Sequence, residues 1–213
     1  MKRILPLLTL ILTTAQANLE ATYRNNLLIN PDTNQPFTGN LDIINNDWGK
    51  DAVEFNKDYV DGILHGYEKV YYQLGELKSL GHFNQGKVDG MVELYYEDGS
   101  IQAQVNFDNG IRQGRAVSYY PDGSKQLEQV FNNDVLDGLH RTWYENGKVM
   151  KSIPYSKGLV HGMVTTYYES GRVFEEVTYE YGKPKLMKVY NEDGTLADIK
   201  GFLDKKVIER FKQ

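Results

Sequence analysis

The sequence predicts an all-β protein, an elongated single-layer antiparallel sheet of stacked β-hairpin repeats with a period of 24 residues. Two observations carry this prediction. Tandem aromatic pairs recur along the chain, and their second members stand 24 residues apart at Tyr72, Tyr96, Tyr120, Tyr144 and Tyr168. A glycine follows each of them after three residues, at Gly75, Gly99, Gly123, Gly147 and Gly171. A fixed period of this length indicates a repeat architecture, in which each unit buries its apolar face by stacking on its neighbours.

The first residues have the pattern of an export signal. Lys2 and Arg3 form a basic region, Ile4 to Leu12 an apolar one, and Ala15-Gln16-Ala17 a small-x-small cleavage site. We therefore expect residues 1–17 to be a signal peptide that is cleaved after Ala17, and the mature protein to be periplasmic or secreted. An uncleaved anchor is the alternative, but the apolar run is shorter than the roughly 20 residues that span a bilayer.

Residues 18–47 depart from the repeat and carry Pro31 and Pro36. Because an open sheet edge invites aggregation, we expect this segment to cap the first edge. The segment from Gln35 to Gly39 resembles a degenerate repeat turn. The repeat array itself is expected over residues 48–194.

Residues 195–213 are expected to form a C-terminal cap. Leu196, Ile199 and Phe202 approximate half a repeat. The four-residue spacing of Leu203, Val207 and Phe211 suits a short helix. A last strand pair that turns at Asp204-Lys205 is the alternative.

Each repeat has the local pattern of a β-hairpin. Ile101, Ala103, Val105 and Phe107 alternate with polar residues, as in a strand with one buried face. Asn109-Gly110 then favours a tight turn, because both residues tolerate positive φ. A second strand follows, and Pro121-Asp122-Gly123 predicts the turn that leads to the next repeat.

Charge and cysteine content exclude several classes of function. The formal net charge is -5, and removal of Lys2 and Arg3 with the signal peptide would make it more negative. This excess of negative charge disfavours binding to the phosphate backbone of a nucleic acid, since nucleic-acid affinity comes largely from clustered Lys and Arg. The chain has no cysteine, which excludes disulfides and thiolate metal sites.

No set of residues in the sequence indicates catalysis, a cofactor or a metal site. His65 and His161 share one column of the repeat, before a glycine, where other repeats have Asp89, Gln113 and Asp137. A shared role in the turn explains this column better than metal ligation. No glycine-flanked nucleophile and no phosphate-binding loop is present. We therefore predict a protein that is not an enzyme and holds no cofactor.

The tandem aromatics form two columns on opposite faces of the predicted sheet. The second aromatic column comprises Tyr72, Tyr96, Tyr120, Tyr144 and Tyr168, and stacking within the columns is expected to stabilise the array. The first aromatic column comprises Tyr71, Tyr95, Tyr119, Trp143 and Tyr167. It can instead form a binding surface, because Tyr, Trp and Arg are enriched at interface hot spots. The candidate partner-binding residues are Tyr71, Tyr95, Tyr119, Arg141, Trp143 and Tyr167. Trp143 is the best single candidate. A purely structural role for these aromatics is the alternative.

The string from Tyr71 to Gly90, with its paired tyrosines and regular glycines, resembles the MORN repeat in its bacterial variant form, including the YwqK-type antitoxin-like proteins. The resemblance covers about residues 48–202. It implies a sheet of hairpins that acts as a scaffold for proteins or phospholipids, with homo-oligomers formed through terminal repeats. This chain departs from the pattern at Asp134, at Lys125, and after Gly182, where Tyr190 follows Tyr168 by only 22 residues and the last repeat is expected to lack two residues.

Two functions follow as expectations. The first is an exported, non-catalytic scaffold that binds a protein, with immunity to a toxin as its most concrete form. The second is a peripheral membrane or lipid-binding envelope protein. Net acidity disfavours the second function, because anionic lipid surfaces attract basic patches. The lysines that form the best local basic stripe are Lys183, Lys185, Lys188 and Lys200.

Overall fold

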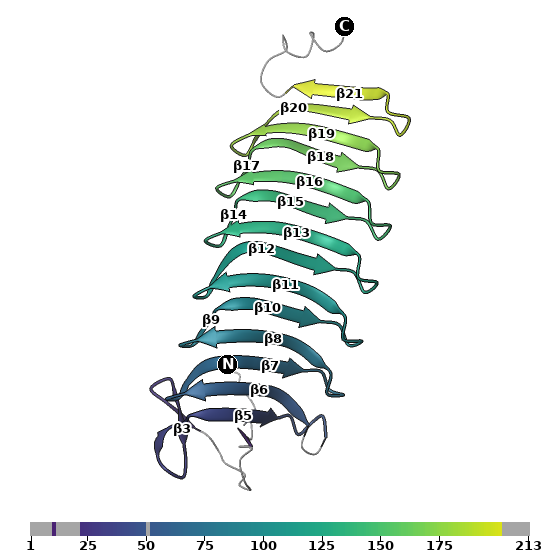
Figure 1. Ribbon diagram of the computed structural model, residues 1–213. Coiled ribbons are helices and arrows are strands. Elements are labelled where there is room, and N and C mark those ends of the chain that lie inside the picture. The colour runs from purple at the N-terminus through teal and green to yellow at the C-terminus, as the bar shows by residue number, and fades with distance from the viewer. Residues whose placement is uncertain (1–9, 12–21, 50–51, 202–213) are drawn as a thin grey trace, which may run out of the picture. The chain divides into compact units, whose positions relative to one another are not determined.

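In the computed structural model of the protein, the described residues are 10–11, 22–49 and 52–201, and every regular element among them is a β-strand (Figure 1). The chain divides between Ile111 and Arg112 into two units, called here the N-terminal and the C-terminal unit. The predicted signal peptide lies outside the described residues except for β1 (Leu10–Ile11), which pairs with β5. The alternatives for residues 203–211 also lie outside them.

In the N-terminal unit the strands are β2 (Thr22–Arg24), β3 (Leu27–Asn30), β4 (Gln35–Pro36), β5 (Gly39–Ile44), β6 (Val53–Val60), β7 (Ile63–Tyr71), β8 (Leu77–Asn84), β9 (Lys87–Val88), β10 (Gly90–Tyr95) and β11 (Ile101–Asp108). Strands β2 to β4 form a small antiparallel sheet. Strands β5, β6, β7, β8, β10 and β11 pair antiparallel in that order, and β9 pairs with β8.

In the C-terminal unit the strands are β12 (Ile111–Tyr119), β13 (Lys125–Asn132), β14 (Val135–Leu136), β15 (Gly138–Trp143), β16 (Val149–Ser156), β17 (Leu159–Val160), β18 (Gly162–Tyr167), β19 (Val173–Glu180), β20 (Lys183–Tyr190) and β21 (Leu196–Gly201). The long strands pair antiparallel in chain order, while β14 and β17 pair with β13 and β16. The predicted fold class of stacked antiparallel hairpins is confirmed. Leu196 and Ile199 lie in β21, as half a repeat requires.

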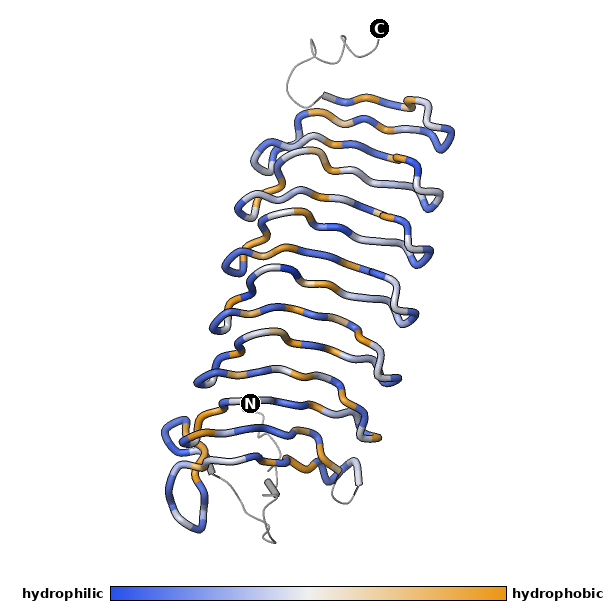
Figure 2. Tube along the Cα trace, in the orientation of Figure 1, coloured by the Kyte–Doolittle hydropathy of each residue, from blue (hydrophilic) through white to orange (hydrophobic). Residues whose placement is uncertain are grey.

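Two kinds of turn alternate within each unit. The first is a two-residue turn in which both residues have positive φ, as in Asn109 (φ 50°) and Gly110 (φ 89°), and it matches the right-handed twist of the paired strands. The second has three residues. At Tyr120 the carbonyl accepts from Gly123 N–H (2.9 Å) and the amide donates to Ser124 O (2.8 Å). Apolar residues recur along the strands, whereas the turns are mostly polar (Figure 2).

Successive repeats are joined at the two-residue turns. Gly158 N–H donates to Leu136 O at 2.8 Å, and Lys157 N–H donates to the Asp137 carboxylate at 3.3 Å. Both amides of the turn are thus bonded to the preceding repeat. The side-chain acceptor comes from the column that contains His65 and His161. Every member of this column accepts from the turn of the next repeat: His65, Asp89, Gln113, Asp137 and His161. The predicted turn role of His65 and His161 is confirmed.

The second aromatic column joins repeats by hydrogen bonds and not by ring stacking, which corrects the expectation from the sequence. Equivalent residues stand two strands apart, about 9.6 Å, which exceeds the separation of stacked rings. A tyrosine can reach that far with its hydroxyl. The hydroxyls of four of its members donate at 2.7–2.8 Å to the carbonyl of a first-column residue: Tyr72 to Tyr95, Tyr120 to Trp143, Tyr144 to Tyr167, and Tyr168 to Tyr190.

The last repeat lacks one residue and not two. Tyr168 donates to the carbonyl of Tyr190, so Tyr190 takes the place of a first-column aromatic. Asn191 then takes the second-column place, because its amide donates to Thr195 O and its carbonyl accepts from Gly194 N–H. The prediction that Tyr190 belongs to the second column is therefore wrong, because asparagine replaces the second-column aromatic in this repeat.

The N-terminal unit has a conventional hydrophobic core. Leu28 and Leu41 are fully buried and pack with Phe37, Ile43 and Tyr59. Burial, and then the hydrogen bond between the hydroxyls of Tyr23 and Tyr59, raises the pKa of Tyr59 far above its usual value. The core therefore joins the small sheet of β2 to β4 to the first strands of the repeat sheet.

Repeat-like geometry extends to Phe37, which is N-terminal to the expected start at residue 48. Phe37 O accepts from Gly62 N–H, and Thr38 Oγ1 accepts from Asp61 N–H at 2.9 Å. These are the same two bonds that join the later repeats. The segment after β4 thus acts as a preceding repeat for the turn at Asp61-Gly62.

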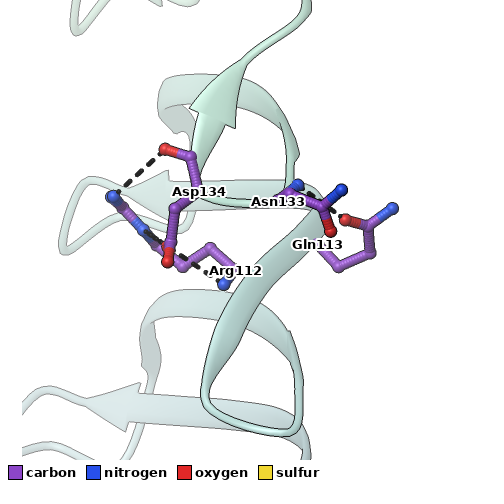
Figure 3. A network of polar contacts seen from close by, with 4 residues as sticks. All are labelled: Arg112, Gln113, Asn133 and Asp134. Carbon is purple, nitrogen blue, oxygen red and sulfur yellow. Dashed lines mark hydrogen bonds and ion pairs between the residues drawn. The ribbon is translucent and has the colours of Figure 1, made fainter.

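Asp134 keeps the turn geometry although it replaces a glycine. Its φ is 64°, in the left-handed region that asparagine and aspartate tolerate better than other side chains. Its carboxylate accepts from Arg112 N–H at 3.0 Å and from Arg112 Nε at 2.8 Å (Figure 3). The guanidinium of Arg112 also lies over the ring of Phe131. The departure from the repeat at Asp134 therefore leaves the turn intact.

Thr142 offers a stabilising substitution. Its hydroxyl is buried and has no hydrogen-bond partner among the described residues. Because Thr142→Val keeps the β-branched shape and removes an unsatisfied polar group, we expect the free energy of unfolding to rise by about 1 kcal/mol. Chemical denaturation measures it, with Thr178→Val at an exposed strand position as the control that should change little. A less stable Thr142→Val protein would show that the hydroxyl is satisfied in solution.

Candidate functional site: two surfaces on the repeat hairpins

The six predicted partner-binding residues are all half-buried and are divided between the two units. Tyr71 on β7 and Tyr95 on β10 belong to the N-terminal unit. The C-terminal unit holds Tyr119 on β12, Arg141 and Trp143 on β15, and Tyr167 on β18. Arg141 and Trp143 are two residues apart on one strand, so their side chains share one face.

A charged cluster surrounds Trp143. Lys125 Nζ lies 5.5 Å from the centroid of the Trp143 ring, within the range of a cation–π interaction. Glu128 accepts from Lys125 at 2.9 Å and from Arg115 at 2.8 Å, and Arg141 lies opposite Glu128 in the strand register. The hydrogen bond from Lys125 holds the pKa of Glu128 below its usual value against the effect of burial, and Arg115 adds to the shift. These five residues are called the Trp143 surface.

Two departures from the repeat meet in the Trp143 surface. Lys125 begins a strand at a position that is aliphatic in the other repeats, at Leu77, Ile101, Val149 and Val173. Trp143 replaces the tyrosine that the other repeats have in the first aromatic column. The two side chains that depart from the repeat pattern therefore contact each other at one place on the surface.

The N-terminal unit places Tyr71 beside an open cleft. The cleft measures about 550 Å³, and its lining residues include Tyr71, Asp42, Val53 and Leu74. Burial, and then the charge of Asp42, raises the pKa of Tyr71 above its usual value. Tyr71 therefore lines a cleft and does not form part of a continuous aromatic surface.

Tyr95 is fixed by its own strand. Its hydroxyl donates to Glu93 at 2.8 Å, and Gln104 donates to the other carboxylate oxygen of Glu93 at 2.9 Å. Burial, and then the bond to Glu93, raises the pKa of Tyr95. This network holds the phenol against the sheet, so Tyr95 fits a structural role better than a binding role.

Sequence reasoning missed Arg115, Glu128 and Leu74. The signal for Lys125 was visible, because it was recognised as a departure from the repeat, but its contact with Trp143 depends on strand register. The signal for Leu74 was also present, since the other repeats have a polar residue at its position. Arg115 and Glu128 carry no periodic signal, and only the pairing of β12 with β13 brings them together.

Within the described part of the chain, no three metal-ligating side chains gather in one place, and no helix is present that has the length and apolarity to cross a membrane. Burial, and then the charge of Lys151, lowers the pKa of His140, whose Nδ1 lies 3.1 Å from Gln129 Nε2. This histidine packs beside Tyr155 within the sheet, as a structural side chain does.

Stacked hairpins with a fixed period, joined by turn amides and tyrosine hydroxyls, define the protein as an all-β repeat protein. A family model described as the MORN repeat variant matches five consecutive segments: residues 64–85, 88–109, 112–133, 136–157 and 160–181. These segments make up just over half of the chain, and the chain belongs to this family. A comparison with curated proteins gives no match. MORN repeats generally mediate interactions with proteins or membranes, and the family is generally non-catalytic.

Proposed function

We propose that the protein is an exported, non-catalytic scaffold that binds a partner protein through the Trp143 surface. The observation that carries this proposal is the contact between Lys125 and Trp143, the two positions where the repeat departs together from its own pattern. Cations also lie over the rings of Tyr72 and Phe131, but those two aromatics are the usual residues of their columns, whereas Lys125 and Trp143 both depart from theirs. Paired changes of this kind fit selection on a surface.

The side chains of the Trp143 surface suit protein recognition. Trp and Arg are the residues most enriched at interface hot spots. Arg115, Lys125 and Arg141 give the surface three cations against one carboxylate, Glu128. The half-buried indole offers apolar contact area, while Arg141 offers a planar pair of donors to a carboxylate. The partner that fits has an acidic side chain next to an apolar or aromatic one.

Export and immunity are the finer parts of this proposal. The basic, apolar and small-residue regions of residues 1–17 support export. An exported scaffold that neutralises a toxin in the periplasm is the most concrete function that fits, and the resemblance of the string from Tyr71 to Gly90 to antitoxin-like repeat proteins supports it. Sequencing the N-terminus of the protein from its native envelope tests the first part, and Asn18 is the expected first residue.

Membrane binding is the weaker candidate. The lysines expected to form a basic stripe are partly neutralised, because Lys185 pairs with Glu180 at 2.8 Å and Lys200 lies 3.5 Å from Asp198. Flotation of residues 18–213 with vesicles of neutral lipid, with and without anionic lipid, separates the two candidates. Vesicle-bound protein would favour the membrane function.

We expect Trp143→Ala to weaken partner binding about tenfold or more, as truncation of a hot-spot side chain does. The partner is first obtained by affinity purification of residues 18–213, tagged at the C-terminus, from the native envelope. Affinity is then measured by calorimetry with wild-type and variant protein. A hydrolase or a pore-forming protein as the stoichiometric partner would support immunity.

Trp48→Ala is the matched control, since Trp48 is the only other tryptophan and lies in the N-terminal unit. It should leave the affinity unchanged. Circular dichroism and thermal melting should stay nearly the same for Trp143→Ala. A variant that binds normally would contradict the proposed surface, and one that fails to fold would assign Trp143 to the core.

A further inference from the structure

Leu74 is the most exposed large apolar side chain among the described residues, at 87%. It lies in the three-residue turn between β7 and β8, where the tube in Figure 2 carries an apolar position among turns that are mostly polar. The equivalent residues of the other repeats are all polar: Asp98, Asp122, Asn146, Ser170 and Asp193.

The usual polar residue stabilises this turn. Asp98 accepts from Ser100 N–H at 2.8 Å and from the Ser100 hydroxyl at 2.6 Å, which lowers the pKa of Asp98. Asp122 makes the same two bonds with Ser124. Leucine makes neither bond. Leucine at position 74 therefore makes the turn less stable than a polar residue would and exposes apolar surface to water. Neither effect stabilises the protein in the absence of a binding partner.

Two clefts flank Leu74 within the N-terminal unit. The first, about 550 Å³, is lined by Tyr71, Asp42 and residues of the β5–β6 hairpin. The second, about 400 Å³, is lined by Tyr72, Glu76 and Glu97. Leu74 lines both clefts and stands between them. An apolar side chain of a ligand can pack on Leu74, and the neighbouring side chains of the ligand can enter the clefts on either side.

The clefts are acidic. Their described lining residues include Asp42, Glu76 and Glu97, and no lysine or arginine. Lys78 is directed to the face of the Tyr72 ring, 5.4 Å from its centroid. Residues 50–51 lie outside the described residues. Carboxylates that border an apolar ridge complement a ligand in which cations flank an apolar side chain.

We propose that the Leu74 surface, formed by Leu74, Tyr71, Asp42, Glu76 and Glu97, binds a peptide segment of a partner protein in which Lys or Arg flanks an apolar residue. This proposal rests on the proposed scaffold function but uses a different surface, with the opposite charge preference from the Trp143 surface. The apolar side chain packs on Leu74 and the wall of Tyr71, and the cations lie near the carboxylates. An anionic lipid surface would be repelled by the same carboxylates.

The test begins with a library of random peptides displayed on phage and selected on residues 18–213. The enriched peptides are then synthesised with a fluorescent label, and their affinities are measured by polarisation at low and high salt. We expect enriched peptides to carry Lys or Arg beside an apolar residue, and their binding to weaken as salt rises. We expect Leu74→Asp to lower their affinity about tenfold or more.

Leu74→Asp also separates binding from folding. Asp is the residue at this position in three of the other repeats. Because it can accept from the Glu76 N–H, the variant should melt no lower than the wild type. Glu76→Gln keeps the shape of the cleft and removes one charge, so it should reduce the salt dependence of binding. Asp122→Leu places an exposed leucine in the equivalent turn of the C-terminal unit and should give no gain in peptide binding.

Several outcomes would overturn the inference: no enriched peptide, enriched peptides without cations, or full affinity for the Leu74→Asp variant. The scaffold function is judged separately by the protein recovered on affinity purification and by its dependence on Trp143. A partner lost on Trp143→Ala together with peptides indifferent to Leu74→Asp would keep the scaffold and remove the Leu74 surface. Absence of any protein partner would remove the scaffold function itself.

Discussion

Gly62→Ala is expected to destabilise the protein by about 3 kcal/mol. Gly62 has a φ of 77°, and a Cβ atom there would lie 2.7 Å from Leu28 O and 3.0 Å from Leu27 Cβ. The positive φ alone costs roughly 1–2 kcal/mol for a residue with a side chain. The clash of the added Cβ with Leu28 O forces β3 away from the turn, because a backbone carbonyl cannot move as a flexible side chain can. It also strains the bond from Leu28 N–H to Gly62 O.

Gly86→Ala is the matched control for Gly62→Ala. Gly86 lies at the equivalent turn position with a φ of 78°, and the nearest atom to its added Cβ would be Ile63 Cγ2 at an ordinary 3.6 Å. It should cost only the backbone strain, roughly 1–2 kcal/mol. Urea denaturation gives both values, and hydrogen exchange at the Leu28 amide reports the local effect. Equal losses in the two variants would show that β3 does not press on this turn in solution.

Leu41→Ala is expected to cost about 3 kcal/mol, which is within the range for a fully buried leucine. Leu41 is 0% exposed and lies in β5 between the small N-terminal sheet and the repeat hairpins. The cavity left behind is bordered by Phe37 and Tyr59, whose rings contact each other edge to face and limit collapse into the space. The expected loss is therefore near the middle of the range for such substitutions.

Leu159→Ala is the control for Leu41→Ala. Leu159 is 48% exposed on β17 of the C-terminal unit, and its truncation should change the free energy of unfolding by less than about 0.5 kcal/mol. Near-ultraviolet circular dichroism should change for Leu41→Ala, because the aromatic rings of Phe37 and Tyr59 border the cavity that the substitution leaves. A small loss for Leu41→Ala would mean that the core of the N-terminal unit is loosely packed.

The repeat fold could be predicted from the sequence because its signals are local and repeated. Asn109-Gly110 specifies a tight turn by itself, and a column such as Gly75, Gly99 and Gly123 confirms each turn with the next. The core around Leu28 and Leu41 was not predictable in the same way. Its residues come from segments that occur once, and their contacts depend on tertiary packing that no period reveals.

The candidate site was predicted only in part. Trp143 and Lys125 were both recognised as departures, yet their contact follows from the pairing of neighbouring strands, which sequence distance does not show. The columns of tyrosines were expected to stack, but the spacing of two strands turns their hydroxyls into donors. Leu74 is a departure of the same kind, because the equivalent residues of the other repeats are polar, but its exposure and the two clefts beside it follow only from the structure.

The bonds at the two-residue turns make the length of this protein easy to change during evolution. Each repeat offers the same carbonyl and side-chain acceptor to its successor and receives them from its predecessor, as at Leu136 and Asp137 for the turn of Lys157-Gly158. A recombination event that inserts or deletes one whole period therefore leaves every junction chemically complete. The number of repeats can therefore change before the surface residues do. A chain can gain an additional hairpin first, and substitutions can alter the exposed residues of that hairpin afterwards.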